Sequence, residues 1–254
     1  MSSALSVAKN ARCSNRLLTL VVLMCVVVAV NVAGELKVAH LNCPGGTRAL
    51  HIKTEDGSET SCITPDGAKQ GPYRAWRQSG RLSVKGEFKE DKREGSWMTW
   101  YPSGGIYAAG PYRMGMKKGI WRTYYENGTK ESEIEYRDDE QHGRWAKWYR
   151  NGKQSECGQV DGVKIVEPRR VRTIKEIGHW TYFYENGRKE KEGAFRDGRK
   201  DGLWVEYYPN GKMRSEGTYD DERRDGRWTY WQEDGQLVRV DEYQKGRLLS
   251  TSPK

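Results

Sequence analysis

The chain has 254 residues and a formal net charge of +9, and only 35% of its residues are hydrophobic. It holds 10 tryptophans, 15 tyrosines and 29 glycines but three phenylalanines. This composition excludes an intrinsically disordered chain, because such chains are poor in aromatics. It indicates short strands and turns, since aromatic rings suit a half-exposed pleated surface and glycine suits turns. No run of five or more like charges occurs, so no nucleic-acid partner is predicted.

Residues 1–34 have the three-part layout of a secretory signal peptide. Basic residues precede an apolar run from Leu17 to Ala33, and small residues come just before Glu35. We therefore expect this segment to be removed and the mature chain to be exported to the periplasm, the cell envelope or the medium. The apolar run is also near the shortest length that spans a bilayer, so an uncleaved N-terminal membrane anchor is the alternative.

Cys43 and Cys62 stand 19 residues apart, ahead of the first full repeat. In an oxidising compartment they are expected to form a disulfide, which on the loop-entropy model contributes roughly 3 kcal/mol. Two free thiols are the alternative. The cysteines form no CxxC pair, so no zinc site is predicted.

Seven copies of one pattern occupy residues 71–246. Each copy begins with a glycine, and these glycines are 24 residues apart except for one step of 35. Counting from this glycine, aromatic residues stand at positions +2 and +5, and all ten tryptophans occupy these positions. The starting glycines are Gly71, Gly95, Gly119, Gly143, Gly178, Gly202 and Gly226.

A second glycine follows at position +9, usually after Asn or Asp, as in Asn127-Gly128. Asn-Gly favours a type I′ turn, in which both central residues have positive φ, so each copy is predicted to be a β-hairpin. A single hairpin is marginal in water, and neighbouring hairpins must pair to bury their rings. The predicted fold is therefore all-β: an elongated antiparallel β-sheet rod of tandem hairpin repeats of about 24 residues. The aromatics at +2 and +5 have opposite parity, so without a bulge they face opposite sides.

Three segments depart from the regular array. Residues 35–70 are expected to form an N-terminal cap, in which a degenerate repeat without tryptophan holds both cysteines. Residues 247–254 are expected to be a short frayed tail. The fourth copy carries 11 extra residues, placed near residues 161–177 and expected to form a loop.

The segments Gly119–Gly128 (GIWRTYYENG) and Gly202–Gly211 (GLWVEYYPNG) resemble the MORN repeat variant, which is common in bacterial proteins, some of them labelled antitoxin-type. The resemblance covers residues 71–246. It implies an elongated antiparallel sheet with a role in scaffolding, membrane-surface attachment or partner binding, and no single shared activity. Asp241 departs from the pattern, because the other copies have glycine or an apolar residue at its position.

No motif for catalysis is found. The chain has no GxSxG, HExxH or phosphate-binding GxxxxGK[ST] sequence, and no segment has the ligand spacing of a calcium loop. We therefore predict that the protein is not an enzyme and has no catalytic residues, metal site or cofactor.

Two sets of residues are candidates for partner binding. The first is the basic insertion, because loops added to a repeat scaffold frequently carry function. Its cations could meet anionic lipid head groups, acidic polysaccharide or an acidic protein, whereas a plain solvated irregularity is the alternative. The second set is the row of aromatics on the face away from the core, which could stack on sugars or pack against a protein, or could merely complete the sheet. The candidates are Lys164, Arg169, Arg170, Arg172 and Lys175 in the insertion, and Trp100 and Trp148 in the row.

The favoured hypothesis is an exported, non-catalytic repeat module that binds a protein or cell-envelope polymer, with an anionic membrane surface as a further possible partner. An antitoxin or immunity-type protein that neutralises a toxin is one alternative. A carbohydrate-binding module that uses exposed aromatics is another. The sequence does not indicate an oligomeric state.

Overall fold

The computed structural model describes residues 41–166 and 171–253. The chain forms two units, Met1–Ala39 and His40–Lys254, and the described residues all belong to the second. The expected targeting segment, residues 1–34, lies outside them.

The described residues form strands and turns, with no helix among them, which confirms the all-β prediction. The strands are β1 (Arg48–Thr54), β2 (Gly57–Ile63), β3 (Lys69–Arg77), β4 (Leu82–Lys89), β5 (Lys92–Trp100), β6 (Ile106–Arg113), β7 (Met116–Lys117), β8 (Gly119–Tyr124), β9 (Lys130–Arg137), β10 (Glu140–Trp148), β11 (Gln154–Val166), β12 (Val171–Phe183), β13 (Lys189–Arg196), β14 (Arg199–Tyr207), β15 (Met213–Asp220), β16 (Arg223–Trp231), β17 (Leu237–Gln244) and β18 (Arg247–Pro253).

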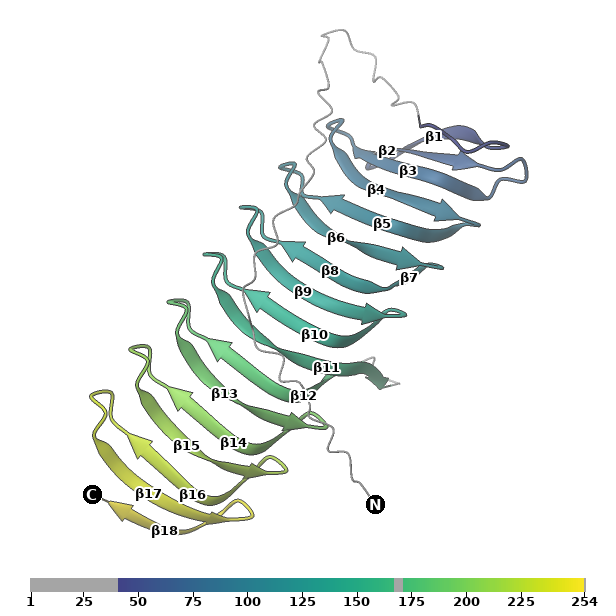
Figure 1. Ribbon diagram of the computed structural model, residues 1–254. Coiled ribbons are helices and arrows are strands. Elements are labelled where there is room, and N and C mark those ends of the chain that lie inside the picture. The colour runs from purple at the N-terminus through teal and green to yellow at the C-terminus, as the bar shows by residue number, and fades with distance from the viewer. Residues whose placement is uncertain (1–40, 167–170, 254) are drawn as a thin grey trace, which may run out of the picture. The chain divides into compact units, whose positions relative to one another are not determined.

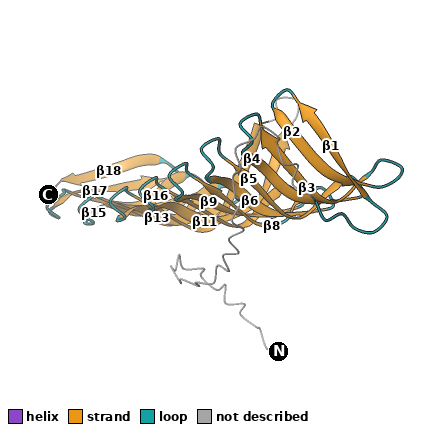
Figure 2. Cartoon of the chain, turned by 90° about the horizontal axis from the view of Figure 1, so that it is seen from above, coloured by secondary structure: helices purple, strands orange, loops and turns teal. Residues whose placement is uncertain are grey.

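These strands make one antiparallel sheet in which successive hairpins lie side by side (Figure 1). Each strand pairs with the next along the chain, except that β7 and β8 both pair with β6. The strands lie in a single layer that no helix covers, and turns line both of its long sides (Figure 2). The elongated sheet of tandem hairpins that the repeat spacing predicts is therefore confirmed.

The aromatic residue at position +2 of each repeat supplies the core. Trp180, Trp204 and Trp228 are almost completely buried. Each of these rings contacts the aromatic residue of a returning strand, as between Trp204 and Phe195, whose centroids lie 5.1 Å apart edge to face. Rings from successive hairpins thereby form two ladders along one face of the sheet, one from Tyr73 to Trp121 and one from Trp145 to Tyr243.

Each core ring in most repeats lies on a glycine of the preceding hairpin. A Cβ atom added at Gly193 would stand 2.3 Å from the ring of Trp204, and Gly86, Gly110, Gly158 and Gly217 have the same relation to their rings. The indole N–H of Trp204 then donates to the carbonyl of Ala194 at 3.0 Å. The glycine thus permits both the close ring contact and the hydrogen bond.

The fourth repeat breaks this rule. Ile134 stands where the other hairpins have glycine, and it pairs directly with Trp145. Among the described residues, the buried Nε1 of Trp145 has no hydrogen-bond partner. We attribute the missing bond to the isoleucine side chain, which occupies the space that the glycine leaves to the other rings.

The prediction of type I′ turns at Asn-Gly was wrong. The N–H of Gly128 donates to the carbonyl of Tyr125, and the N–H of Tyr125 donates to the carbonyl of Thr129. Gly128 has a φ of 84°, whereas Asn127 is not among the residues with positive φ. This is a type I turn followed by a residue in the left-handed region, which gives a three-residue loop.

Two-residue turns with positive φ occur at the opposite ends of the strands. Asp138 and Asp139 have φ values of 51° and 69°, and Asp221 and Glu222 have 50° and 70°. Such turns contain either two acidic residues or a glycine in second place, as in Asp197-Gly198, and Asp tolerates the left-handed region because its short polar side chain bonds locally.

The N-terminal cap is a hairpin of β1 and β2 that pairs with β3. A disulfide joins Cys43 and Cys62, as predicted, and Cys62 is fully buried. Pro44 packs so closely on Gly71 that a Cβ there would lie 2.6 Å from the proline ring. The disulfide and Pro44 hold the segment before β1 against the first repeat.

The frayed tail expected at residues 247–254 is instead strand β18, paired with β17. Asp241 explains the difference. It is buried and accepts hydrogen bonds from the hydroxyl of Thr251 at 2.9 Å and from Nε of Arg239 at 3.1 Å. The strand that follows presents Thr251 at this position rather than a tryptophan ring, so a carboxylate fits.

The extra residues of the fourth repeat extend two strands and are not the expected loop. Strands β11 and β12 have 13 residues each, and they pair from Val160 and Glu176 out to Val166 and Val171. The segment alternates β-branched and polar residues, which favours an extended hairpin over an irregular loop. Figure 1 shows this hairpin reaching beyond its neighbours.

Candidate functional site

The candidate aromatics Trp100 and Trp148 are half-buried and lie on β5 and β10. Ring centroids of Trp180 and Tyr182 are 5.9 Å apart, so positions +2 and +4 share a face. Because side chains alternate along a strand, position +5 belongs to the opposite face. We call the two sides the core-ring face and the outer face.

The structure does not bring these two rings together. Tyr124 occupies the same position in the repeat between them, and the ammonium of Lys130 lies 4.1 Å from the ring centroid of Trp148. The carbonyl of Trp148 accepts the hydroxyl of Tyr125 at 2.8 Å. Trp148 therefore takes part in contacts between neighbouring hairpins.

The basic residues of the insertion have different positions. Lys164 on β11 is in register with Thr173, and Arg172 on β12 is in register with Ile165. Arg169 and Arg170 lie outside the described residues.

Lys175 is engaged within the sheet. Its ammonium lies 2.8 Å from a carboxylate oxygen of Asp197, in the next turn. This hydrogen bond holds the pKa of Asp197 below its usual range and raises that of Lys175. The carboxylate of Asp197 thus partly neutralises the positive charge of Lys175.

The asparagines before the turn glycines link neighbouring hairpins, a role that turn chemistry alone did not predict. Oδ1 of Asn186 accepts the N–H of Arg188 at 2.9 Å, and Nδ2 donates to the carbonyl of Pro209 in the next turn at 2.8 Å. Asn127, Asn151 and Asn210 make the same pair of bonds. The row of asparagines is therefore a ladder of hydrogen bonds along one side of the sheet.

Tyrosines at position +6 form a second ladder. The hydroxyl of Tyr184 donates to the carbonyl of Tyr207 at 2.7 Å, in the aromatic position of the next repeat. The same bond recurs at Tyr101, Tyr125, Tyr149 and Tyr208. The sequence holds a signal for this ladder, because tyrosine recurs at position +6 at the repeat spacing. The carbonyl that accepts its hydroxyl is known only once the hairpins are paired in the structure.

Cations cover the core rings. Nζ of Lys200 lies 4.5 Å from the ring centroid of Trp204 and 4.9 Å from that of Tyr219. The residue two positions before the starting glycine has this role in five repeats, through Lys69, Arg93, Lys117, Lys200 and Arg224. Much of the excess positive charge is thus used in cation–π contacts that stabilise the sheet.

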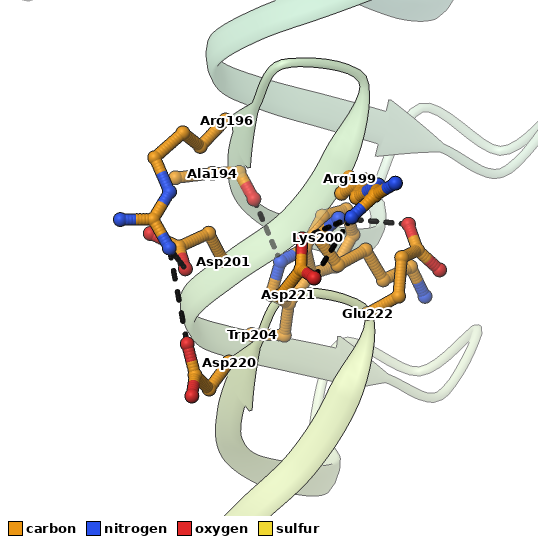
Figure 3. Close-up of polar contacts among 9 residues, drawn as sticks. All are labelled: Ala194, Arg196, Arg199, Lys200, Asp201, Trp204, Asp220, Asp221 and Glu222. Carbon is orange, nitrogen blue, oxygen red and sulfur yellow. Dashed lines mark hydrogen bonds and ion pairs between the residues drawn. The ribbon is translucent and has the colours of Figure 1, made fainter. Parts of the chain in front are cut away.

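The acidic turns on the other side of the sheet are also paired (Figure 3). Arg199 lies 2.8 Å from Asp221, and this hydrogen bond keeps the pKa of Asp221 below its ordinary value. Arg196 bridges Asp201 at 2.8 Å and Asp220 at 3.8 Å. These carboxylates connect neighbouring hairpins, so their structural role accounts for the acidic cluster.

One stretch of the sheet differs from the rest in its surface chemistry. Residues 95–125 contain no Asp or Glu, and we call them the acid-free hairpin. Five of the eleven large hydrophobic side chains that are exposed among the described residues belong to it: Met98, Ile106, Tyr107, Met114 and Met116. Met98 and Ile106 lie on the outer face, whereas Tyr107 lies on the core-ring face, so these side chains share one segment but not one continuous patch.

The three methionines stand where the neighbouring repeats carry charged residues. Met98 replaces Arg74 and Arg122 of the neighbouring repeats, and Met114 occupies a turn position where Asp138 and Asp221 stand elsewhere. Met114 is 62% exposed and has a φ of 52°. This positive φ belongs to the turn, since Glu90, Asp138 and Asp221 have similar values at the same position.

The described residues contain no group of three or more His, Cys, Asp or Glu side chains that could hold a metal ion. Within the same ranges there is also no helix long and apolar enough to cross a membrane.

Comparison with known proteins agrees with the repeat geometry. The family model of the MORN repeat variant matches residues 117–138, 200–221 and 224–245. Comparison with curated proteins gave no match. The matched segments cover β7 to β9, β14 to β15 and β16 to β17, and the other hairpins repeat their spacing, rings and turns. Three segments of the chain therefore match the MORN repeat variant, and the other hairpins share their geometry.

Proposed function

We propose that this protein is an exported, non-catalytic module that binds a protein or cell-envelope polymer, and that the acid-free hairpin is its main contact surface. MORN repeats are in general repeats of protein or membrane interaction, which fits this class. The observation that carries the proposal is the replacement of charged residues of the neighbouring repeats by the exposed methionines Met98, Met114 and Met116.

The chemistry of this surface favours a partner with apolar and acidic groups. Met98 and Ile106 lie on the outer face of β5 and β6, and methionine adapts its shape to a partner at low cost. Arg113 and Lys118 are exposed nearby, and the hairpin has no acidic residue to repel an anionic group. Complementary charge of this kind speeds association and orients the partner.

The basic insertion is proposed as a second contact. Lys164 and Arg172 belong to the part of the β11–β12 hairpin that extends past its neighbours, since β10 pairs with β11 only as far as Asp161. Lys175 contributes less, because Asp197 already pairs with it.

The surface is tested by capture of partners on tagged full-length protein from the cells that express it. Met98→Glu combined with Ile106→Glu should lose the partner, because a buried carboxylate without a counter-ion is costly at an apolar contact. Leu203→Glu is the matched control, since Leu203 is 60% exposed on the outer face of another repeat. Retention of the partner by the double variant, or equal loss in the control, would contradict the assignment.

Export is tested separately. We expect the N-terminal sequence of the protein to begin at or near Glu35 and the mature chain to leave the cytoplasm. A chain that keeps residues 1–34 and sediments with membranes would support the anchor instead.

A further inference from the structure

A small pocket lies on the core-ring face, between β6, β8 and β9. Its volume is about 160 Å³, and Trp121, Tyr136 and Ile134 line one part of it. Tyr107, Thr123 and Ser132 line another part. Because the pocket lies on the core-ring face, a ligand bound there would not contact Met98 or Ile106 on the outer face.

The pocket results from small side chains at two repeat positions. Thr123 stands at position +4, where later repeats carry Lys147, Tyr182, Glu206 and Tyr230. Ser132 stands at position +13, where three of the four later repeats carry Glu156, Lys191 and Arg239 and the sixth carries Ser215. Ala108 extends the same small-residue row on β6, since it pairs with Thr123. The larger side chains that cover most of these positions in the later repeats are absent here, which leaves a hollow that two hydroxyl groups line.

Besides the ammonium of Lys117, which lies over the rings of Trp121 and Tyr136, the lining has two kinds of recognition group. Oγ1 of Thr123 and Oγ of Ser132 are 2.7 Å apart, and their mutual bond uses one hydroxyl hydrogen, which leaves the other hydrogen and several lone pairs for a ligand. Tyr107 is 46% exposed and lies edge to face on Tyr101, with ring centroids 5.1 Å apart. Its ring therefore stands fixed beside a pair of hydroxyls.

We propose that this pocket binds one sugar ring of a glycan, with the C–H groups of the sugar against Tyr107 and its hydroxyls bonded to Thr123 and Ser132. A sugar ring carries apolar C–H faces and hydrogen-bonding hydroxyls together, which matches this lining. An apolar side chain of a protein partner fits less well, because it would seal the two hydroxyls away from water without replacing their bonds. The volume is well below that of pockets for drug-sized ligands, so it suits a single ring.

The test uses saturation-transfer NMR on the full chain, with trisaccharides of glucose, galactose, mannose and N-acetylglucosamine as probes. We expect saturable binding of at least one probe. Thr123→Tyr fills the pocket with a side chain that the fold accepts at Tyr182 and Tyr230, and it should abolish binding while the melting temperature is retained. Ser132→Ala should weaken binding about tenfold through the lost hydrogen bond.

Val238→Ala is the matched control, because Val238 has the repeat position of Tyr107 in the seventh repeat. Its binding should equal that of the unchanged protein. No saturable signal with any of the four probes, or undiminished binding by Thr123→Tyr, would overturn the proposal. Protein capture through Met98 and Ile106 should persist in Thr123→Tyr, so failure of the sugar site is distinguishable from failure of the proposed function.

Discussion

At the scale of single residues, the contact between glycine and tryptophan determines how closely hairpins pack. Gly193 lies directly on the ring of Trp204, whereas Ile134 at the same position leaves the indole N–H of Trp145 without a partner. A single methyl group at the glycine must therefore displace a buried indole.

We expect Gly193→Ala to lower the free energy of unfolding by about 2 kcal/mol, the usual scale of overpacking in a well-packed core. Chemical denaturation measures the change. Gly105→Ala is the control, because Gly105 has no positive φ and its added Cβ would lie 3.7 Å from the nearest atom. Equal stability of the two variants would show that the ring moves freely.

Glu192 gives a prediction about pH. Burial raises its pKa, but hydrogen bonds from Lys189 and Tyr207 outweigh burial and hold the pKa below its ordinary 4.5. Burial and the bond to Glu192 also raise the pKa of Tyr207 to about 12. A carboxyl with a depressed folded-state pKa contributes stability above its unfolded pKa and loses it as the pH falls through the folded value.

The melting temperature should therefore fall on acidification below about pH 4.5. In Glu192→Gln this fall should be smaller, because the titrating group is gone, whereas Glu233→Gln in an exposed turn should behave like the unchanged protein. Parallel pH profiles for Glu192→Gln and the unchanged chain would refute the role of this carboxylate.

At the scale of the hairpin, turns on one side of the sheet carry the asparagine ladder and those on the other carry paired acidic residues. Asn186 donates to the following hairpin, but Asp234 in the last repeat has no following Asn-Gly turn within the described residues. The amide is needed only where a neighbouring carbonyl is present, and this explains why a carboxylate suffices at Asp234.

Asn186→Asp should lower the free energy of unfolding by about 1 kcal/mol, because it keeps the acceptor for Arg188 and loses the donor to Pro209. Asp234→Asn should leave stability unchanged. Thermal unfolding of both variants compares the two effects. An Asn186→Asp protein as stable as its parent would show that the asparagine ladder does not contribute to stability.

At the scale of the whole sheet, stability is the sum of hairpins and of the contacts between neighbours. The extended part of the β11–β12 hairpin pairs with neither β10 nor β13 over residues 163–174. Its backbone therefore adds no strand pairing with the regular hairpins on either side.

Replacement of residues 162–174 by Asn-Gly should restore the 24-residue spacing and leave the fold intact, because two-residue turns connect the equivalent strands elsewhere. Circular dichroism and the melting temperature should match those of the parent within error. A protein that fails to fold would make the insertion part of the structural frame.

Repeat spacing alone determined the strands of the repeats, their hairpin order and the two faces, because ring and turn positions recur along the chain. The Cys43–Cys62 disulfide was predicted from the expected oxidising compartment instead. The repeat pattern misassigned the Asn127 turn, because Asn-Gly is compatible with more than one turn type, and the same three-residue loop forms at Ser79-Gly80 and Asp234-Gly235 without an asparagine. It also missed β18, because the residues that hold this strand, Asp241 and Thr251, form no local pattern.

Only the tertiary structure placed Thr123, Ser132 and Tyr107 around one pocket, since they come from three strands and two repeats. The same holds for the acid-free hairpin, whose composition was visible but whose exposure depends on which face each strand presents. Local sequence thus determines the repeating unit, and pairing between units decides which departures from the repeat lie together on the surface.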